Sequence, residues 1–273
     1  MSVRHPPRHP LRVALIAGSG LYALPELADG TDRPVTSRYG APSAPVRAGR
    51  MAGVEILFLP RHGTGHTLPP HRINYRANID ALRTLGATHC IAIAAVGGIS
   101  APMGAGRIAI PHQLIDYTHG RAHTFFDGDG DGKGEGDAPG GAAAPAPVTH
   151  VDFTHPYDEG LRQALLAAAS EAGIDACPYG VYGAVQGPRL ETAAEVDRLA
   201  RDGCDLVGMT GMPEAGLARE AGLPYATLAV VANRAAGRGE GLLSMAQILE
   251  TLRLGMVEAT RCLALALPRI RVG

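Results

Sequence analysis

The chain has 273 residues and a hydrophobic content of 46%, which is enough to bury the core of one large domain. Its 25 basic and 26 acidic side chains nearly balance, which excludes the broad positive field typical of proteins that bind nucleic acid or anionic membranes. The apolar runs are too short for a signal peptide or a membrane span, which favours a cytoplasmic protein. Residues 1–10, with their Pro and His, predict a disordered tail before a domain over 11–273.

Short apolar runs alternate along the chain with longer segments of helical spacing, a pattern typical of α/β proteins. Strands are expected at residues 12–18, 55–60, 89–97, 107–112, 179–185, 204–209 and 225–233. Helices are expected at residues 74–86, 158–173 and 244–267, and another begins soon after Thr210. Most strands are apolar on both faces, so we predict a single domain with a central mixed β-sheet flanked by helices.

Polar groups follow the first two expected strands. The turn "AGSGL" places Ser19 among glycines whose backbone N–H groups can converge on an anion. It lacks the third glycine of the dinucleotide fingerprint, which disfavours a dinucleotide-binding oxidoreductase. In "PRHGTGH", Arg61 and His62 supply a fork of donors and a titratable donor that suit an oxyanion such as phosphate. Taken alone, the first stretch is explained equally well by a tight turn, and the second by two solvated side chains.

Three later strand ends repeat this association. "AAVGG" closes the strand at 89–97 with small residues that let a ligand approach the backbone. "QGPRLETAAE" sets Glu191 beside the apolar Leu190, which suits a flat heterocycle that carries an N–H group. Asn233 ends the last expected strand with an amide that both donates and accepts. Packing explains the first of these, a Glu at a helix start the second and a turn Asn the third, but their occurrence at successive strand ends predicts a ligand site.

Two further features carry no predicted chemistry. The segment 127–147 is of low complexity, and although Asp127, Asp129 and Asp131 resemble the start of a calcium loop, the twelfth position is Ala138 instead of Glu. We expect a disordered surface insertion there. The cysteines lie far apart without a C-x-x-C pair, which predicts core positions and no zinc site or disulfide framework. They are Cys90, Cys177, Cys204 and Cys262.

The stretches "LPRHGTGHTLPPHRINYRANIDAL", "VGMTGMPEAGLARE" and "QGPRLETAAE" together resemble the trimeric purine nucleoside phosphorylase and 5'-methylthioadenosine phosphorylase family. The similarity covers about residues 12 to 269 apart from the insertion, and the combination of motifs is highly specific. It implies phosphorolysis, in which inorganic phosphate attacks C1' of a purine nucleoside and releases the free base. It also implies a homotrimer with shared sites and no cofactor or metal.

By position, the resemblance assigns phosphate binding to Ser19, Arg61, His62, the backbone of Ala95 and Thr210. It places Met209 against the ribose, with Thr210 in reach of phosphate or sugar. The chain departs from the methylthioadenosine branch at one point, because Ala94 stands where that branch has a phosphate-binding Thr. One phosphate contact is therefore expected to be missing.

The expected base-binding residues are Leu190, Glu191, Asn233 and Ala235. Methylthioadenosine enzymes have an Asp pair where this chain has Asn233 and Ala235. An amide donates to a 6-oxo oxygen that two carboxylates would repel, and the Glu of 6-oxopurine enzymes, here Glu191, accepts from N1–H. A 6-oxopurine base is therefore favoured, with Asn233, Glu191 and His62 as the expected catalytic residues. Leu190 replaces the aromatic residue usual in that motif.

At the 5' end of the sugar, Met245 and Leu249 occupy positions where methylthio enzymes have apolar residues. His66 and His150 flank them at positions that the family lends across the subunit interface. Helix packing explains the spacing of Met245 and Leu249 equally well. Together, the base and 5' pockets predict phosphorolysis of S-methyl-5'-thioinosine. The alternatives are inosine and guanosine phosphorolysis, methylthioadenosine phosphorolysis, or a non-catalytic purine nucleoside binder.

Overall fold

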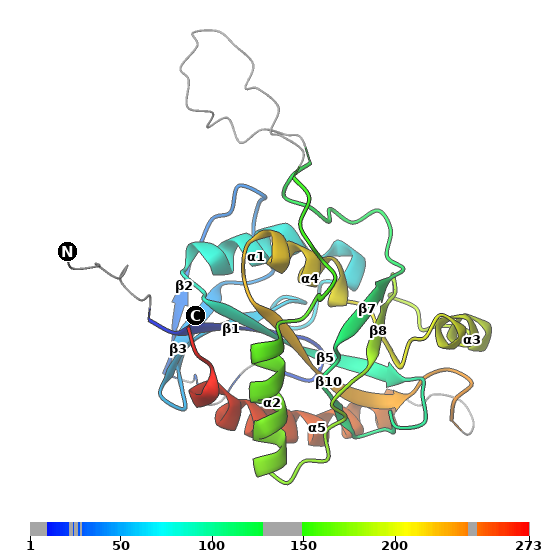
Figure 1. The fold of residues 1–273 in the computed structure, drawn as a ribbon. Coiled ribbons are helices and arrows are strands. Elements are labelled where there is room, and N and C mark those ends of the chain that lie inside the picture. Colours follow the sequence, from blue (N-terminus) through cyan, green and yellow to red (C-terminus); the bar gives the residue numbers. More distant parts are fainter. Residues whose placement is uncertain are drawn as a thin grey trace, which may run out of the picture.

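The computed structural model describes residues 10–21, 24, 27, 29–127, 149–239 and 245–272. These residues form three layers, with a twisted sheet between two layers of helices (Figure 1). The expected tail at 1–10, apart from Pro10, and the expected insertion at 127–147, apart from Asp127, lie outside the described residues.

The sheet is mixed, and its central strands are buried on both faces, as predicted. Its strands are β1 Arg12–Ala17, β2 Thr31–Arg33, β3 Val46–Met51, β4 Val54–Pro60, β5 His89–Gly98, β6 Ile108–Ala109, β7 Gln113–Asp116, β8 Val181–Ala184, β9 Leu206–Gly208 and β10 Tyr225–Arg234. Their order is β2-β3-β4-β1-β5-β9-β8-β7, with β10 paired to β5 and β6. The β1/β4, β1/β5 and β5/β10 pairs are parallel, and the β5/β9 pair is antiparallel.

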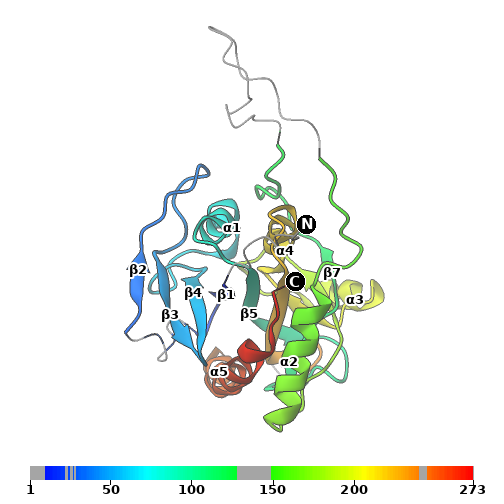
Figure 2. The same ribbon diagram turned by 60° about the vertical axis from the view of Figure 1, so that its left-hand side comes forward.

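Helices cover both faces of this sheet. They are α1 Tyr75–Thr84, α2 Glu159–Glu171, α3 Ala193–Arg201, α4 Gly211–Glu220 and α5 Met245–Ala266, with short 3-10 turns at Pro70–Arg72 and Leu267–Arg269. Figure 2 shows α1 and α4 side by side on one face, and α2 and α5 on the other. One apolar core lies between the sheet and α2 with α5, and a second lies beneath α1 and α4. No helix among the described residues is long and apolar enough to cross a membrane.

Strand β5 creates the opening in which the candidate site lies. On one edge β5 pairs with β10 from Cys90 to Gly98. On the other edge it pairs with β1 only as far as Ile93, and with β9 only from Gly97 onward. Residues 94–96 therefore have no strand partner on that edge, which leaves a gap between the carboxyl end of β1 and the β5/β9 pairing.

The four cysteines are free thiols in buried positions, which confirms that they fill the core. Strands β2, β3 and β7 and helix α3 were not predicted, and the strand expected at 107–112 is reduced to Ile108–Ala109. The other expected strands and helices are present within a few residues of their predicted bounds.

Candidate active site

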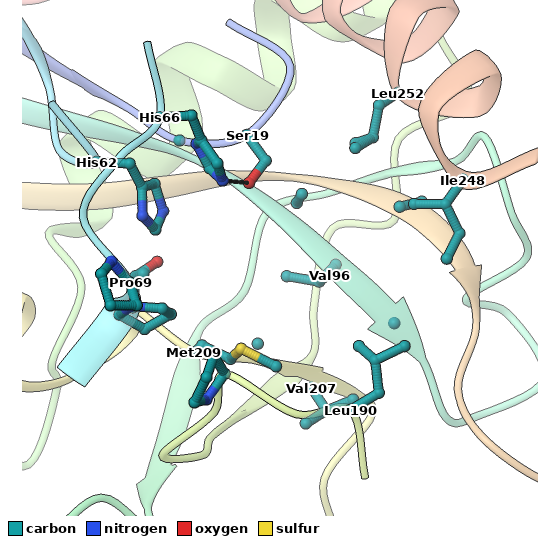
Figure 3. A pocket seen from close by; sticks show the side chains of 18 of the residues that line it. Ser19, His62, His66, Pro69, Val96, Leu190, Val207, Met209, Ile248 and Leu252 are labelled. Atoms are coloured by element: carbon teal, nitrogen blue, oxygen red, sulfur yellow. Dashed lines mark hydrogen bonds between the residues drawn. The ribbon is translucent and has the colours of Figure 1, made fainter. Parts of the chain in front are cut away.

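A cavity of about 540 Å³ lies at the carboxyl ends of the strands, beside the unpaired edge of β5. Ligands bind at this place in open α/β sheets, and the volume suits a small molecule. The residues expected at a ligand site that line it are Ser19, Arg61, His62, His66, Ala95, Leu190, Glu191, Met209, Thr210, Asn233, Met245 and Leu249. In Figure 3, Ser19, His62 and His66 gather on one side of the cavity, and the side chains labelled across from them, Val96, Leu190, Ile248 and Leu252, are apolar.

The turn after β4 brings two histidines to Ser19. His66 has a left-handed φ of 58°, and its ring packs against the His62 ring with centroids 4.4 Å apart. The Nε2 atom of His66 lies 3.5 Å from the hydroxyl oxygen of Ser19 (Figure 3). The resemblance implied that His66 serves the site of a neighbouring subunit. In this chain the turn folds the ring back over His62, so His66 also lines the cavity of its own subunit.

His62 is buried and neutral near pH 7. Burial lowers its pKa to about 4, despite the hydrogen bond from Nδ1 to the carbonyl oxygen of Leu68 at 2.8 Å. Since a carbonyl oxygen only accepts, Nδ1 carries the proton of the neutral ring, and Nε2 presents a lone pair. The sequence predicted a donor at His62. The structure indicates an acceptor, which suits the O–H group of hydrogen phosphate or of a sugar.

The guanidinium of Arg61 is largely engaged by protein groups, and the residue is only 1% exposed. Its Nε and Nη2 donate to the two carboxylate oxygens of Glu214 at 3.0 and 2.9 Å, and Nη1 donates to the carbonyl of Ile93 at 2.8 Å. The fork expected to hold phosphate is therefore occupied by Glu214, to which Tyr225 also donates at 2.9 Å. Arg61 reaches the cavity wall at Nη1, which lies beside Gly18, where a Cβ would lie 2.7 Å from Nη1.

The backbone from Gly208 to Thr210 forms part of the cavity wall and leads directly into α4. Tyr182 packs behind it, because a Cβ at Gly208 would lie 2.1 Å from the Tyr182 hydroxyl oxygen, and one at Gly211 would lie 2.9 Å from its ring. The two glycines thus allow the chain to lie close against Tyr182. Thr210 precedes α4, and its side chain does not cap the helix.

At the other end of the cavity, an amide and a carboxylate face the same space. Asn233 follows a bulge in β10, and its Nδ2 donates to the carbonyl oxygen of Arg234 at 2.7 Å. This bond fixes the amide and leaves its oxygen and one N–H for a ligand. Glu191 lies in the loop before α3, where burial raises the pKa of its carboxyl group. Leu190, beside it, is 44% exposed.

The first two turns of α5 supply an apolar wall. Ile248 and Leu252 are buried within the cavity, whereas Met245 and Leu249 are 60% and 55% exposed at its mouth. Sequence analysis did not assign Ile248 and Leu252 to the site, because cavity-lining and core residues share the same helical spacing. It also missed Val207, whose apolar strand gave no sign that one face meets a ligand.

Two predicted site residues lie outside the cavity wall. Ala235 is buried in a small core with Ile99 and Val207, because the chain leaves β10 after Arg234 and turns behind Gly97. His150 is exposed and does not contact the cavity of its own chain. Within the described ranges, no three His, Cys, Asp or Glu side chains form a group that could hold a metal ion.

Comparison with known proteins gives a consistent result. The family model of the phosphorylase superfamily matches residues 12–268. A Pseudomonas syringae pv. tomato protein named probable S-methyl-5'-thioinosine phosphorylase is 49% identical over 251 residues, which cover 92% of this chain and 96% of that protein. The 6-oxopurine nucleoside phosphorylase of Pyrococcus furiosus is 40% identical over 259 residues, which cover 95% of this chain and 93% of that protein.

Among solved structures, methylthioadenosine phosphorylase from Schistosoma mansoni in complex with adenine has a TM-score of 0.84 and 32% identity, and the match covers 94% of this chain and 91% of that one. The chain therefore belongs to the phosphorylase superfamily.

Proposed function

We propose that this protein catalyses the phosphorolysis of S-methyl-5'-thioinosine to hypoxanthine and 5-methylthioribose 1-phosphate, a purine salvage reaction. The observation that carries this proposal is the composition of the single cavity described above. An amide and a carboxylate face one part of it, Ser19 and His62 face another, and the start of α5 gives it an apolar wall. Relatives at 49% identity named for this activity support the assignment.

Inorganic phosphate is the co-substrate in this proposal, and no metal or other cofactor takes part. Ser19 donates its hydroxyl proton to phosphate, His62 accepts from the O–H of hydrogen phosphate, and Arg61 contributes its charge and one N–H. The free edge of β5 at Ala95 adds backbone groups, and Thr210 adds a second hydroxyl. Held in this way, phosphate lies near C1' of the nucleoside with little orientational freedom left to lose.

The base is released as negative charge accumulates on the purine. The C1'–N9 bond lengthens toward an oxocarbenium-like state, and the electrons of that bond move into the ring. The amide of Asn233 donates to the 6-oxo oxygen or accepts from a protonated N7, and ionised Glu191 accepts from N1–H. Groups placed for the developing charge lower the barrier more than groups that bind the ground state equally well. Met209 packs against the ribose.

The 5' substituent meets the wall formed by α5. A methylthio group fits among Met245, Leu249 and Ile248, whereas a hydroxyl left unpaired there costs roughly 1 to 3 kcal/mol. A second candidate, phosphorolysis of inosine and guanosine, is favoured by the exposure of Met245 and Leu249, since water reaches their side chains. The relative from Pyrococcus furiosus supports this alternative.

The 5' pocket is tested with Leu249→Gln, which places an amide where the methylthio group would lie. We expect the ratio of kcat/KM for methylthioinosine to that for inosine to fall about tenfold, which corresponds to about 1.4 kcal/mol. Leu254→Gln is the matched control, because Leu254 is 54% exposed on the same helix but does not line the cavity. Equal ratios in both variants and wild type would favour the inosine alternative.

The base pocket is tested with Asn233→Asp, which sets a carboxylate against the 6-oxo oxygen. We expect kcat/KM for methylthioinosine to fall at least tenfold, while that for methylthioadenosine stays level or rises. Undiminished methylthioinosine turnover would argue against the assignment of Asn233 to the base. Turnover of the nucleoside without phosphate would indicate hydrolysis. No turnover in the presence of phosphate would indicate a protein that only binds nucleosides.

We also propose that the enzyme is a cytoplasmic homotrimer. The buried free thiols suit a reducing compartment. Exposed apolar side chains at the cavity mouth, Leu190, Met245 and Leu249, suit a surface that a second subunit covers. In this arrangement His150 reaches the 5' pocket of a neighbouring chain.

A further inference from the structure

Arg121 is a buried arginine whose hydrogen-bond partners are all neutral. It follows β7, and only 9% of the residue is exposed. Among its contacts in the described part of the chain there is no carboxylate. Buried cations are usually paired with an acid, as Arg61 is with Glu214. An arginine retained without such a partner points to a task that its planar array of donors performs.

Its donors join two loops. The guanidinium donates to the carbonyl oxygens of Met212 (2.7 Å), Met209 (2.9 Å), Gln186 (2.9 Å) and Val185 (3.3 Å), to the side-chain oxygen of Gln186 (3.2 Å) and to the hydroxyl of Tyr75 (3.2 Å). Met209 and Met212 lie on either side of the start of α4. Val185 and Gln186 begin the loop between β8 and α3. One side chain thus connects the turns that follow β8 and β9.

Both turns lead directly into the cavity wall. The turn after β9 carries Met209 and Thr210, and the turn after β8 carries Leu190 and Glu191. Arg121 itself does not line the cavity, so any effect on a ligand passes through these loops.

The backbone that bears Arg121 is itself anchored. Glu220, at the end of α4, accepts from the hydroxyl of Thr124 at 2.7 Å and from the N–H of Phe125 at 2.6 Å. The side chains of Asp127 and Arg76 form an ion pair a little farther along. These contacts hold the segment against α4 and α1, so the guanidinium reaches the two loops from a fixed position.

We infer that Arg121 is a positioning residue for the nucleoside, which sets the distance between the loop that bears Met209 and the loop that bears Glu191. The expected effect on kinetics rests on the proposed phosphorolysis, whereas the bridge between the two loops does not depend on the reaction. Lysine cannot replace it, because an ammonium group has three donors at one point, whereas the guanidinium has five donors spread over a plane.

The test compares Arg121→Met and Arg121→Lys with wild type in steady-state kinetics and amide hydrogen exchange. For Arg121→Met, we expect KM for methylthioinosine to rise at least tenfold and KM for phosphate to rise by a smaller factor, because Ser19 and His62 lie on other strand ends and only Thr210 is on a loop that Arg121 holds. Amides of residues 185–192 and 209–212 should exchange at least tenfold faster. Arg121→Lys should show most of both changes, although it keeps the charge.

Arg162→Met is the matched control. Arg162 is also a buried arginine, and it donates to the carbonyls of Pro111 (3.0 Å) and Pro178 (2.6 Å) and pairs with Glu159. Neither it nor these partners line the cavity. We expect this variant to lose stability without a change in either KM or in the exchange of the two loops.

Each outcome decides the inference. The inference would be overturned if Arg121→Met kept the wild-type KM for the nucleoside and the wild-type amide exchange of the two loops. It would also be overturned if Arg121→Lys fully recovered both quantities, since the positive charge alone would then suffice. If Arg121→Met does not fold, the Lys variant decides in the same way. If wild type catalyses no phosphorolysis, the proposed function fails. The bridge between the loops is then still tested by two measurements, the amide exchange of the two loops and the nucleoside dissociation constant from calorimetry.

Discussion

At the residue scale, His62 is kept neutral by burial, which lowers its pKa to about 4. Because the unfolded chain takes up this proton near the ordinary pKa of 6.5, the unfolded state binds more protons between about pH 4 and 6.5. His62 therefore lowers the free energy of unfolding as pH falls through this window, by up to about 1.4 kcal/mol per pH unit. The effect is absent above it.

This pH dependence is tested with His62→Asn, whose amide can still donate to the Leu68 carbonyl but does not titrate. Between pH 6.5 and 4, the free energy of unfolding of the variant, from urea denaturation, should fall less steeply than that of wild type. The Cε1–H signal of His62 in NMR spectra should remain that of a neutral ring down to pH 5. A titration midpoint near 6.5 would show that burial does not control this residue.

The Arg61–Glu214 pair gives a second prediction at this scale. Glu214→Leu leaves the guanidinium buried without its carboxylate, so we expect a loss of about 3 to 5 kcal/mol in the free energy of unfolding. The double variant Arg61→Met with Glu214→Leu removes both charges and should recover most of that loss, but not the phosphate-dependent activity. Chemical denaturation and phosphorolysis assays separate the two effects. A Glu214→Leu protein as stable as wild type would contradict the account.

Single residues were predictable where a motif fixes both identity and position. Ser19, Arg61 and Asn233 lie in the cavity because Ser19 and Arg61 follow strands that the sequence identified and Asn233 lies near the end of another. What the sequence did not contain was the partner of each group. The Leu68 carbonyl makes His62 an acceptor, and Glu214, 153 residues from Arg61, occupies its donors. Such contacts depend on long-range packing, which no local pattern encodes.

At the element scale, Gly255 controls how closely α5 approaches β10. A Cβ at Gly255 would lie 2.3 Å from Cγ1 of Val230, on the strand that carries Asn233. Alanine is favoured over glycine within a helix by about 1 kcal/mol. We nevertheless expect Gly255→Ala to lower the free energy of unfolding by about 1 to 3 kcal/mol, because Val230 is fully buried in the core that β10 shares with α5 and the new methyl group would overpack it.

Thermal and urea unfolding of Gly255→Ala measure this effect. Adding Val230→Ala opens space for the new methyl group, so the double variant should be more stable than Val230→Ala alone. A stabilised Gly255→Ala single variant would mean that α5 is not held tightly against the sheet.

The predicted elements were those with a strong pattern. Helices α1, α2 and α5 repeat apolar residues on one face, and β1, β4, β5 and β10 are continuous apolar runs, so burial alone identified them. Strand β2 has three exposed residues, and β3 interrupts its pattern with Gly49, so neither gave a signal. Helix α3 begins with a capping box at Thr192 and Glu195, which the sequence contained but which we interpreted as a ligand-binding stretch.

At the scale of the whole molecule, the cavity is open where Leu190, Met245 and Leu249 are exposed. If a second subunit covers this mouth, analytical ultracentrifugation should give the mass of three chains at micromolar concentration. His150→Ala should leave that mass unchanged and reduce kcat/KM for the nucleoside.

Subunit mixing tests the sharing directly. Trimers assembled from His150→Ala chains and Glu191→Ala chains should regain activity, because some sites then combine an intact Glu191 with an intact His150 from a neighbour. A monomeric protein with full activity would contradict the shared site.

The overall architecture was predictable because the order of apolar strands and amphipathic helices specifies a mixed sheet with helices on both faces. The opening of the sheet at β5 was not predictable. It depends on the pairing of β5 with β1, which ends at Ile93, and on its pairing with β9, which begins only at Gly97. The sequence indicated that ligand-binding residues follow the strands. Only the pairing of the strands explains why they surround one cavity.

The most direct test of the central claim is a comparison of kcat/KM for methylthioinosine, inosine and methylthioadenosine, each with and without phosphate, measured by release of the free base. We predict strictly phosphate-dependent release, with methylthioinosine preferred at least tenfold over both other nucleosides, or about 1.4 kcal/mol at the transition state. Preference for inosine would contradict the apolar 5' pocket, and preference for methylthioadenosine would contradict the roles of Asn233 and Glu191.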